Sequence, residues 1–307
     1  MVGSPGHARA RAYLERRLAE IGLTPYRGES FALGYANERA RVESYNLVGV
    51  VEGGDPRLAP VLVGAHYDSV IAAPCADDNA AAVAIALSTA TALKATARQR
   101  DVVIALFDAE EPPYFLGPGM GSIRFCEDQA DRRGFHAAIV MDLVGHEFAL
   151  PLPGLANLLV ATGIETSGTL PKLIDACPRP AQLPLVVAQN DVVGDMSDHH
   201  AFRVRRVPYL FLSCGRWAHY HRETDTADRL AWDKMAMIRD YVVALADELA
   251  AANLAVPPVV TTEMEIRYLE AALGPVLPMV LGTLRMTALR TRADLQRLAM
   301  GMQAMGI

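Results

Sequence analysis

The stretch Val61-Leu-Val-Gly-Ala-His66-Tyr67-Asp68 joins five small or apolar residues directly to a histidine and an aspartate. An apolar run of this kind is typical of a strand that is buried on both faces of a mainly parallel sheet. Similar runs occur at 47–51, 102–107, 138–143, 185–188 and 209–213. Helix-like stretches, such as 79–95 and 232–252, lie between several of them. This alternation predicts an α/β fold, a doubly wound and mainly parallel sheet with helices on both faces.

Polar side chains follow these runs at the points where the strands should end. The 102–107 run leads into Asp108-Ala-Glu110-Glu111, and the 138–143 run contains Asp142. In open α/β sheets, binding sites form at the carboxyl ends of the strands, so we expect these side chains to meet His66 there. Two further polar segments, Asp77-Asp78-Asn79 and 219–226, are rich in aspartate and histidine and complete the candidate set.

The residue types in these segments match zinc chemistry. Three carboxylates and two imidazoles suit Zn²⁺ in catalytic sites, where one position stays open for water. Three carboxylates and a bridging hydroxide offset the four charges of two zinc ions, which favours two ions per chain. Glu110 and Glu111 are neighbours, and neighbouring side chains on an extended backbone point to opposite sides. One of them can therefore bind metal while the other faces the substrate, and Asp68 can accept a hydrogen bond from the ring of His66.

Composition excludes several other classes of protein. The chain has 307 residues, of which 51% are hydrophobic, and a formal net charge of −6 without a long basic run. Neither nucleic acid nor an anionic membrane is an expected partner. The apolar run at 271–284 is too short to span a bilayer. The first residues lack the layout of a secretory signal, so we expect a cytoplasmic protein, and four dispersed cysteines predict free thiols.

The chain shows no linker before Pro257-Pro258. We therefore expect a catalytic α/β domain at 1–255 and a helical extension at 256–307. Leu295, Leu298, Met302 and Met305 recur at helical spacing, and such an apolar stripe is costly to leave in water. The extension should pack on the catalytic domain or on a second copy, which predicts a possible homo-oligomer through the C-terminal helices.

Taken together, these segments resemble the M28 family of zinc peptidases, the aminopeptidase group related to glutaminyl cyclases. The resemblance is carried by five motifs along most of the chain: Gly64-Ala-His66-Tyr-Asp68-Ser, Asp77-Asp78-Asn79, Glu110-Glu111 followed by Met120-Gly-Ser, Met141-Asp142, and Ser197-Asp198-His199 with Tyr220-His221-Arg-Glu-Thr-Asp225-Thr226. It is specific because all five occur in the family's order. The chain departs from many relatives in having Asn79-Ala-Ala-Ala after the bridging aspartate.

The resemblance implies a role for each motif residue. Asp78 would bridge the two metals, with Asp77 as the alternative that the family's spacing disfavours. His66 and Asp142 would complete one zinc site, and Glu111 and His221 the other. It also implies that Glu110 is the general base and that Tyr220 hydrogen-bonds the oxyanion, and it leaves His199 and His219 as packing or supporting groups.

The function implied is a metal-dependent aminopeptidase that acts on peptides with a free N-terminus. One alternative is a glutaminyl cyclase, an acyltransferase of the same fold that works with a single zinc. The other is a binding module that has lost its metals, against which the intact ligand set argues.

Overall fold

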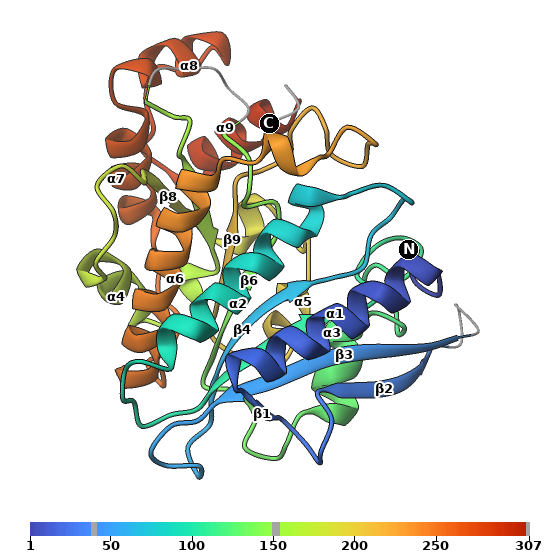
Figure 1. The fold of residues 1–307 in the computed structure, drawn as a ribbon. Coiled ribbons are helices and arrows are strands. Elements are labelled where there is room, and N and C mark those ends of the chain that lie inside the picture. Colours follow the sequence, from blue (N-terminus) through green and yellow to red (C-terminus); the bar gives the residue numbers. More distant parts are fainter. Residues whose placement is uncertain (38–41, 149–153, 305–307) are drawn as a thin grey trace.

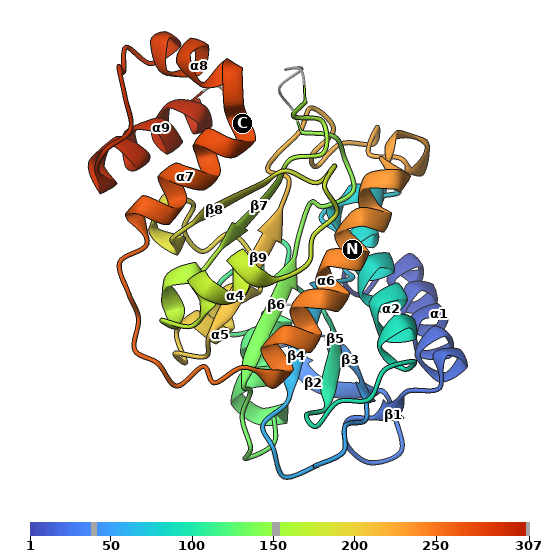
Figure 2. The same ribbon diagram turned by 90° about the vertical axis from the view of Figure 1, so that its left-hand side faces the viewer.

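The structure is a computed structural model that describes residues 1–37, 42–148 and 154–304. Within this part of the chain, nine strands form a single mixed sheet in the order β1-β3-β5-β4-β6-β9-β7-β8, with β2 paired to β3 (Figures 1 and 2). The strands are β1 Thr24–Pro25, β2 Ala32–Asn37, β3 Val42–Val51, β4 Val61–His66, β5 Val102–Phe107, β6 Ala137–Met141, β7 Leu159–Thr162, β8 Leu185–Ala188 and β9 Tyr209–Ser213.

The centre of the sheet is parallel, and an antiparallel pair joins it to each flank. Strands β5, β4, β6 and β9 run in the same direction, whereas β3 pairs with β5, and β7 with β9, in antiparallel register. Every residue of β4, β5 and β6 is buried. The α/β sandwich expected from the apolar runs is therefore present, with its buried parallel strands in the middle.

Helices cover both faces of this sheet. On one face, α1 (Pro5–Ile21), α2 (Ala82–Leu93) and α6 (Trp232–Ala251) lie side by side, as Figure 1 shows, and pack with α4 (Leu170–Ala176) on one large apolar core. On the other face, α3 (Gly121–Arg124), the π-helical turn Phe125–Gln129 and α5 (His199–Arg203) form a second core. The two cores lie on opposite faces because successive strand residues point to opposite sides.

Helix α1 illustrates how local sequence sets an element's ends. The side chain of Ser4 accepts a hydrogen bond from the backbone N–H of His7, and Pro5 occupies the first helical turn. Gly22 closes the helix with φ of 77°, a left-handed conformation that glycine adopts without steric cost.

The C-terminal segment forms α7 (Thr262–Leu273), α8 (Leu277–Thr283) and α9 (Arg292–Ala304). These helices enclose a third apolar core, which includes Leu295 and Leu298 of the expected stripe, with Met302 packed against it. Met305 lies outside the described residues. Helix α7 packs beside strand β8, so the extension lies against the sheet edge (Figure 2). Among the described helices, none combines the length and apolar character needed to cross a membrane.

Candidate metal centre

Three of the predicted site segments meet at the carboxyl ends of the parallel strands. His66 is the last residue of β4, Asp142 directly follows β6, and Glu110 lies three residues beyond β5. The backbone N–H of Tyr67 donates to the carbonyl of Phe107, which extends the pairing of β4 and β5 up to the site. The carboxyl ends of the parallel strands therefore position these side chains.

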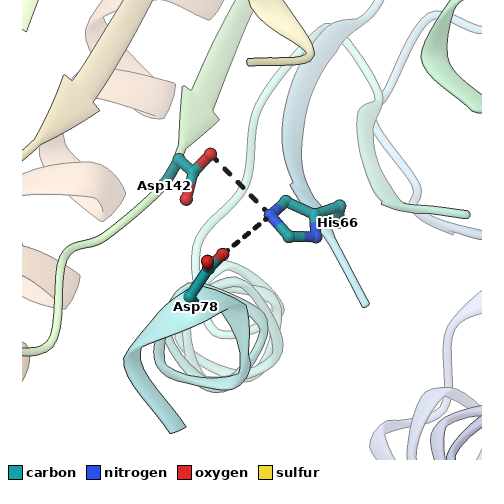
Figure 3. A group of neighbouring side chains, drawn as sticks. All are labelled: His66, Asp78 and Asp142. Atoms are coloured by element: carbon teal, nitrogen blue, oxygen red, sulfur yellow. Dashed lines mark ion pairs between the residues drawn. The ribbon is translucent and has the colours of Figure 1, made fainter. Parts of the chain in front are cut away.

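The first cluster consists of His66, Asp78 and Asp142 (Figure 3). Nε2 of His66 lies 3.4 Å from Oδ1 of Asp78 and 3.7 Å from Oδ2 of Asp142. All three side chains are buried, and one possible ligand atom from each falls within 4.8 Å of the others.

The second cluster shares Asp78 and adds Glu111 and His221. Nε2 of His221 lies 3.1 Å from Oδ2 of Asp78 and 3.2 Å from Oε2 of Glu111. The two oxygens of Asp78 thus face different clusters, Oδ1 toward His66 and Oδ2 toward His221.

The polar atoms of these residues are better satisfied by a bound metal ion than by hydrogen bonds to one another. Each of the five side chains has a buried polar atom that makes no hydrogen bond within the described part of the chain: His66 Nε2, Asp78 Oδ2, Glu111 Oε1, Asp142 Oδ1 and His221 Nε2. Unpaired buried polar atoms are costly, and an ion bound between them would remove that cost. The mixture of imidazole nitrogen and carboxylate oxygen is a zinc-type donor set.

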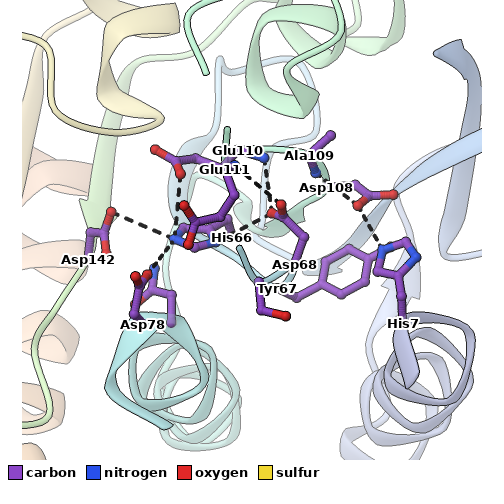
Figure 4. A network of polar contacts seen from close by, with 12 residues as sticks. His7, His66, Tyr67, Asp68, Asp78, Asp108, Ala109, Glu110, Glu111 and Asp142 are labelled. Carbon is purple, nitrogen blue, oxygen red and sulfur yellow. Dashed lines mark hydrogen bonds and ion pairs between the residues drawn. The ribbon is translucent and has the colours of Figure 1, made fainter. Parts of the chain in front are cut away.

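Asp68 supports both the histidine and the glutamate pair (Figure 4). Its Oδ1 lies 3.4 Å from Nδ1 of His66, on the side of the ring that faces away from the cluster. Its two oxygens also accept hydrogen bonds from the backbone N–H groups of Glu110, at 3.0 Å, and Glu111, at 3.2 Å. A hydrogen bond from the His66 ring was expected from the sequence, but the structure shows an ion-pair contact without a hydrogen bond. The support of the glutamate backbone was not expected.

Glu110 and Glu111 occupy different positions in the site. Glu111 belongs to the second cluster, while Oε2 of Glu110 lies 3.8 Å from Nε2 of His66 and only 4% of the residue is exposed. Burial raises the pKa of Glu110 well above its ordinary value, and the neighbouring carboxylates Asp142 and Asp198 add to the rise while His66 opposes it.

Tyr220 lies against the second cluster. Its ring stacks on His221 with centroids 3.7 Å apart and planes 22° apart. Burial is the main reason that the pKa of its hydroxyl is raised, and Asp78 and Glu111 raise it further. The hydroxyl therefore stays protonated at neutral pH and can act as a hydrogen-bond donor.

Sequence reasoning assigned no role to Asp225, which holds the backbone of the shared aspartate. The N–H groups of Asp77 and Asp78 donate to its two carboxylate oxygens at 2.9 and 3.1 Å. Asp77, the disfavoured alternative for the bridging position, belongs to neither cluster. Its carboxylate instead accepts hydrogen bonds from the N–H of Gly145, at 2.6 Å, and Nδ1 of His146, at 2.7 Å. The position of Asp225 inside a motif was the available signal.

A second unexpected contact comes from the N-terminal helix. Nε2 of His7 lies 2.8 Å from Oδ1 of Asp108, and its ring stacks on Tyr67 at 5.2 Å. Asp108 also accepts a hydrogen bond from the N–H of Tyr45 at 2.8 Å. These contacts fix the backbone just before Glu110, and no local pattern links residues so far apart in the sequence.

The Ser197-Asp198-His199 motif lies behind the site. Asp198 is fully buried, and burial raises its pKa to about 7, with Asp68 and Asp142 contributing and His66 opposing. His199 is a packing residue: its ring stacks on Phe211 at 4.2 Å, and Nε2 bonds to the carbonyl of Gly194 at 3.2 Å.

Comparison with known proteins places this geometry in context. The model of peptidase family M28 matches residues 46–246. Protein YfbL of Escherichia coli K12, described as uncharacterized, is 27% identical over 213 residues, which cover 60% of this chain and 65% of YfbL. The chain thus spans just under two thirds of the length of that relative.

Solved structures share the fold. The LapA aminopeptidase of Legionella pneumophila matches with a TM-score of 0.60 and 20% identity, over 80% of this chain and 64% of LapA. The zinc aminopeptidase BSAP of Bacillus subtilis matches with a TM-score of 0.57 and 20% identity, over 70% of this chain and 53% of BSAP. A glutaminyl cyclase of Tannerella forsythia matches with a TM-score of 0.63 and 16% identity, over 82% of this chain and 92% of the cyclase. Because the family model matches about two thirds of the chain, from within β3 to within α6, the chain belongs to peptidase family M28.

Proposed function

We propose that this protein is a two-zinc aminopeptidase that hydrolyses the first peptide bond of substrates with a free N-terminus. The observation that carries the proposal is the position of Asp78 between two clusters, each of which offers a carboxylate and an imidazole besides Asp78. His66 and Asp142 would hold one ion, and Glu111 and His221 the other. Family membership and the fold shared with zinc aminopeptidases support this assignment.

When bound, zinc polarises a carbonyl group and lowers the pKa of water to about 7. The side chains of the protein supply the proton transfers. Glu110 accepts the proton of the attacking water as the water oxygen bonds to the carbonyl carbon. It then delivers this proton to the amine nitrogen as the carbon–nitrogen bond breaks. Tyr220 donates a hydrogen bond to the carbonyl oxygen while negative charge develops there.

The proposed base is suited to this shuttle by its surroundings. Glu110 is buried beside the first cluster and its backbone is fixed by Asp68, so its carboxylate is oriented before substrate binds.

The alternative is a glutaminyl cyclase, because a glutaminyl cyclase also shares this fold. A cyclase uses the substrate's own amine as the nucleophile and needs one zinc and no activated water. A single ion would leave the unpaired atoms of Glu111 or of Asp142 unsatisfied. The paired clusters therefore favour the hydrolase.

The two functions are separated by metal analysis together with a substrate panel. We expect about two zinc ions per full chain by plasma mass spectrometry, and release of free amino acids from aminoacyl substrates. Asp78→Asn should lower the content of both ions, whereas Glu111→Gln and Asp142→Asn should each lower it by about one. One retained ion with cyclisation of N-terminal glutamine, and no hydrolysis, would assign the protein to the cyclases instead.

A further inference from the structure

Arg216 is an exposed cation beside the site that forms no ion pair with the described residues. The loop after β9 carries Arg216, Tyr220 and His221. The guanidinium carbon of Arg216 lies 5.2 Å from the ring centroid of Tyr220, and that ring stacks on His221 of the second cluster. Arg216 and His221, a proposed metal ligand, therefore contact the same aromatic ring.

The loop holds this arginine in place through its neighbours. The N–H of Cys214 donates to the carbonyl of Leu143 at 2.9 Å, and the N–H of Gly215 donates to Oγ of Ser213 at 3.0 Å. On the other side, Trp217 stacks on buried His146 with ring centroids 4.9 Å apart. The backbone of Arg216 is thus anchored on both sides, while its side chain is exposed.

The charge of Arg216 is not used within the described part of the chain. Its guanidinium contacts the Tyr220 ring, and no carboxylate of the described residues lies within 4.0 Å of it. Some other arginines near the protein surface use their charge on such partners: Arg133 bonds to Asp131 at 2.8 Å, and Arg267 bonds to Asp175 at 2.8 Å. An arginine stacked on a ring still directs its N–H donors outward in its own plane, so a ligand can occupy them.

We propose that Arg216 binds a carboxylate of the substrate, an inference that rests on the peptidase function proposed above. The planar fork of arginine matches a carboxylate with two parallel hydrogen bonds. A peptide offers this group from two sources, its free C-terminus when it is short, or an aspartate or glutamate side chain. Arg216 is exposed and lies against the Tyr220 ring beside the second cluster, so its charge can attract such a group toward the site.

Paired substrates that differ only in the carboxylate test the proposal. Alanyl-alanine is compared with its amide for the C-terminal source, and aspartyl p-nitroanilide with the asparaginyl analogue for the side-chain source. One of these two pairs should show the effect. In Arg216→Gln, kcat/KM for the acidic substrate of that pair should fall about tenfold, equal to ~1.4 kcal/mol, whereas kcat/KM for its neutral analogue should change by less than about twofold. Arg216→Lys should restore part of the loss because it keeps the charge without the fork.

The matched control is Arg132→Gln, which makes the same charge change at an exposed arginine before β6, at the opposite end of the strands from the site. It should leave both members of each pair unchanged. An equal loss for acid and neutral substrates in Arg216→Gln would overturn the proposal, since it would mean that Arg216 only positions Tyr220. An unchanged acid substrate would overturn it as well.

Binding separates this proposal from the function on which it rests. Calorimetry on Glu110→Gln, in which turnover is slowed by about 10²- to 10⁴-fold, measures the affinity for alanyl-alanine and its amide, and for alanyl-aspartate and alanyl-asparagine. If the acid binds more tightly than its neutral partner, and this difference is lost when Arg216→Gln is added, the role of Arg216 is supported. This conclusion would hold even if the wild-type protein hydrolysed no peptide. The absence of hydrolysis would reject only the proposed peptidase function. Equal affinities would reject Arg216 as a carboxylate site.

Discussion

At the scale of single residues, Asp78 is held by another carboxylate rather than by its own helix. The carboxylate of Asp225 accepts hydrogen bonds from the backbone N–H groups of Asp77 and Asp78. The carboxylate of Asp77 in turn accepts hydrogen bonds from Gly145 and His146. The carboxylate of Asp78 thus projects from a backbone that is fixed on both sides. Such supporting hydrogen bonds orient metal ligands and limit the entropy lost on binding.

The first prediction concerns Glu110. Replacing it by glutamine removes the proton acceptor and preserves size, so kcat should fall by about 10²- to 10⁴-fold. Metal content should be unchanged because Glu110 belongs to neither cluster. Steady-state kinetics and metal analysis check both points, with Glu127→Gln at the exposed Glu127 as the control. Near-normal turnover would remove Glu110 from the mechanism.

The second prediction concerns acid stability and His199. Burial lowers the pKa of His199 to about 4, against an ordinary value of 6.5. The unfolded chain therefore binds this proton more readily than the folded one between those values. The free energy of unfolding should decrease as pH falls from 6.5 toward 4, by on the order of 3 kcal/mol from this group alone.

Urea denaturation between pH 4.5 and 7 measures this effect. His199→Phe keeps an aromatic ring against Phe211 and removes the titration. The variant should show a shallower fall in stability over this range than the wild-type protein. Parallel curves for the two proteins would show that His199 does not carry the dependence.

At the scale of elements, a buried glutamate joins the C-terminal helices to the sheet. Glu265 of α7 is 1% exposed and accepts hydrogen bonds from the N–H of Gln189, just after β8, and from the hydroxyl of Thr261. Arg292 of α9 pairs with both of its oxygens. A buried charge with this many partners fixes the geometry of a junction, and removing one partner costs about 3–5 kcal/mol.

The third prediction concerns the extension as a whole. Helices α7 to α9 cover Phe148, Leu155 and Leu158, which lie between Asp142 and β7 and are buried in the third core. Deleting 260–307 exposes them, at ~1.5–3 kcal/mol for each side chain. The truncated protein should aggregate or change its oligomeric state, and it should lose activity because the chain that leaves Asp142 loses its support.

Size-exclusion chromatography and melting curves check this prediction. Two point variants on α9 form a matched pair: Leu298→Asp buries a charge in the third core, whereas Met300→Asp alters a residue that is 61% exposed. The first should lower the melting temperature and the second should leave it nearly unchanged. A soluble truncated protein with unaltered assembly and melting would contradict the proposed role of the extension, including any homo-oligomer formed through it.

At the scale of the whole molecule, the fold concentrates negative charge at one end of its sheet. The carboxyl ends of β4, β5 and β6 bring Asp142, Glu110 and Glu111 together, and the turn before α2 adds Asp78. Burial raises the pKa of Glu111 to about 9, with repulsion from Asp78 as the next cause. Bound cations would compensate this repulsion, so folding and metal binding should be coupled.

The fourth prediction follows from this coupling. A group whose folded pKa is raised binds more protons in the folded state, so metal-free protein should lose stability as pH rises from about 4.5 to 9. Treatment with a chelator should therefore lower the melting temperature, and more at pH 9 than at pH 6. Scanning fluorimetry with and without chelator measures this, with Asp78→Asn as a control that should respond little. Equal melting temperatures under all four conditions would contradict it.

The sequence by itself determined the local features of this protein. The runs at 102–107, 185–188 and 209–213 coincide with β5, β8 and β9, because continuous apolar character is a local property of buried strands. Strand β2 was not predicted, since its two alanines, its glycine and its partly exposed positions give no such signal. The helix expected at 79–95 begins instead with a π-helical turn at Ala76–Ala81, in which Asp78 and Asn79 have non-helical dihedral angles. That departure occurs where Asp78 must reach both clusters.

Only the tertiary structure decided which of these residues act on one another. Asp225 meets Asp77 across 148 positions of sequence, and His7 meets Asp108 across 101, because strand order and helix packing bring them together. Likewise, the five ligand positions have the right residue types in the sequence, but the division of Asp78 between two clusters depends on the direction of each carboxylate oxygen. Residue type and periodicity are local properties of a chain. Shared ligands and supporting contacts come from distances between segments, which only the folded molecule contains.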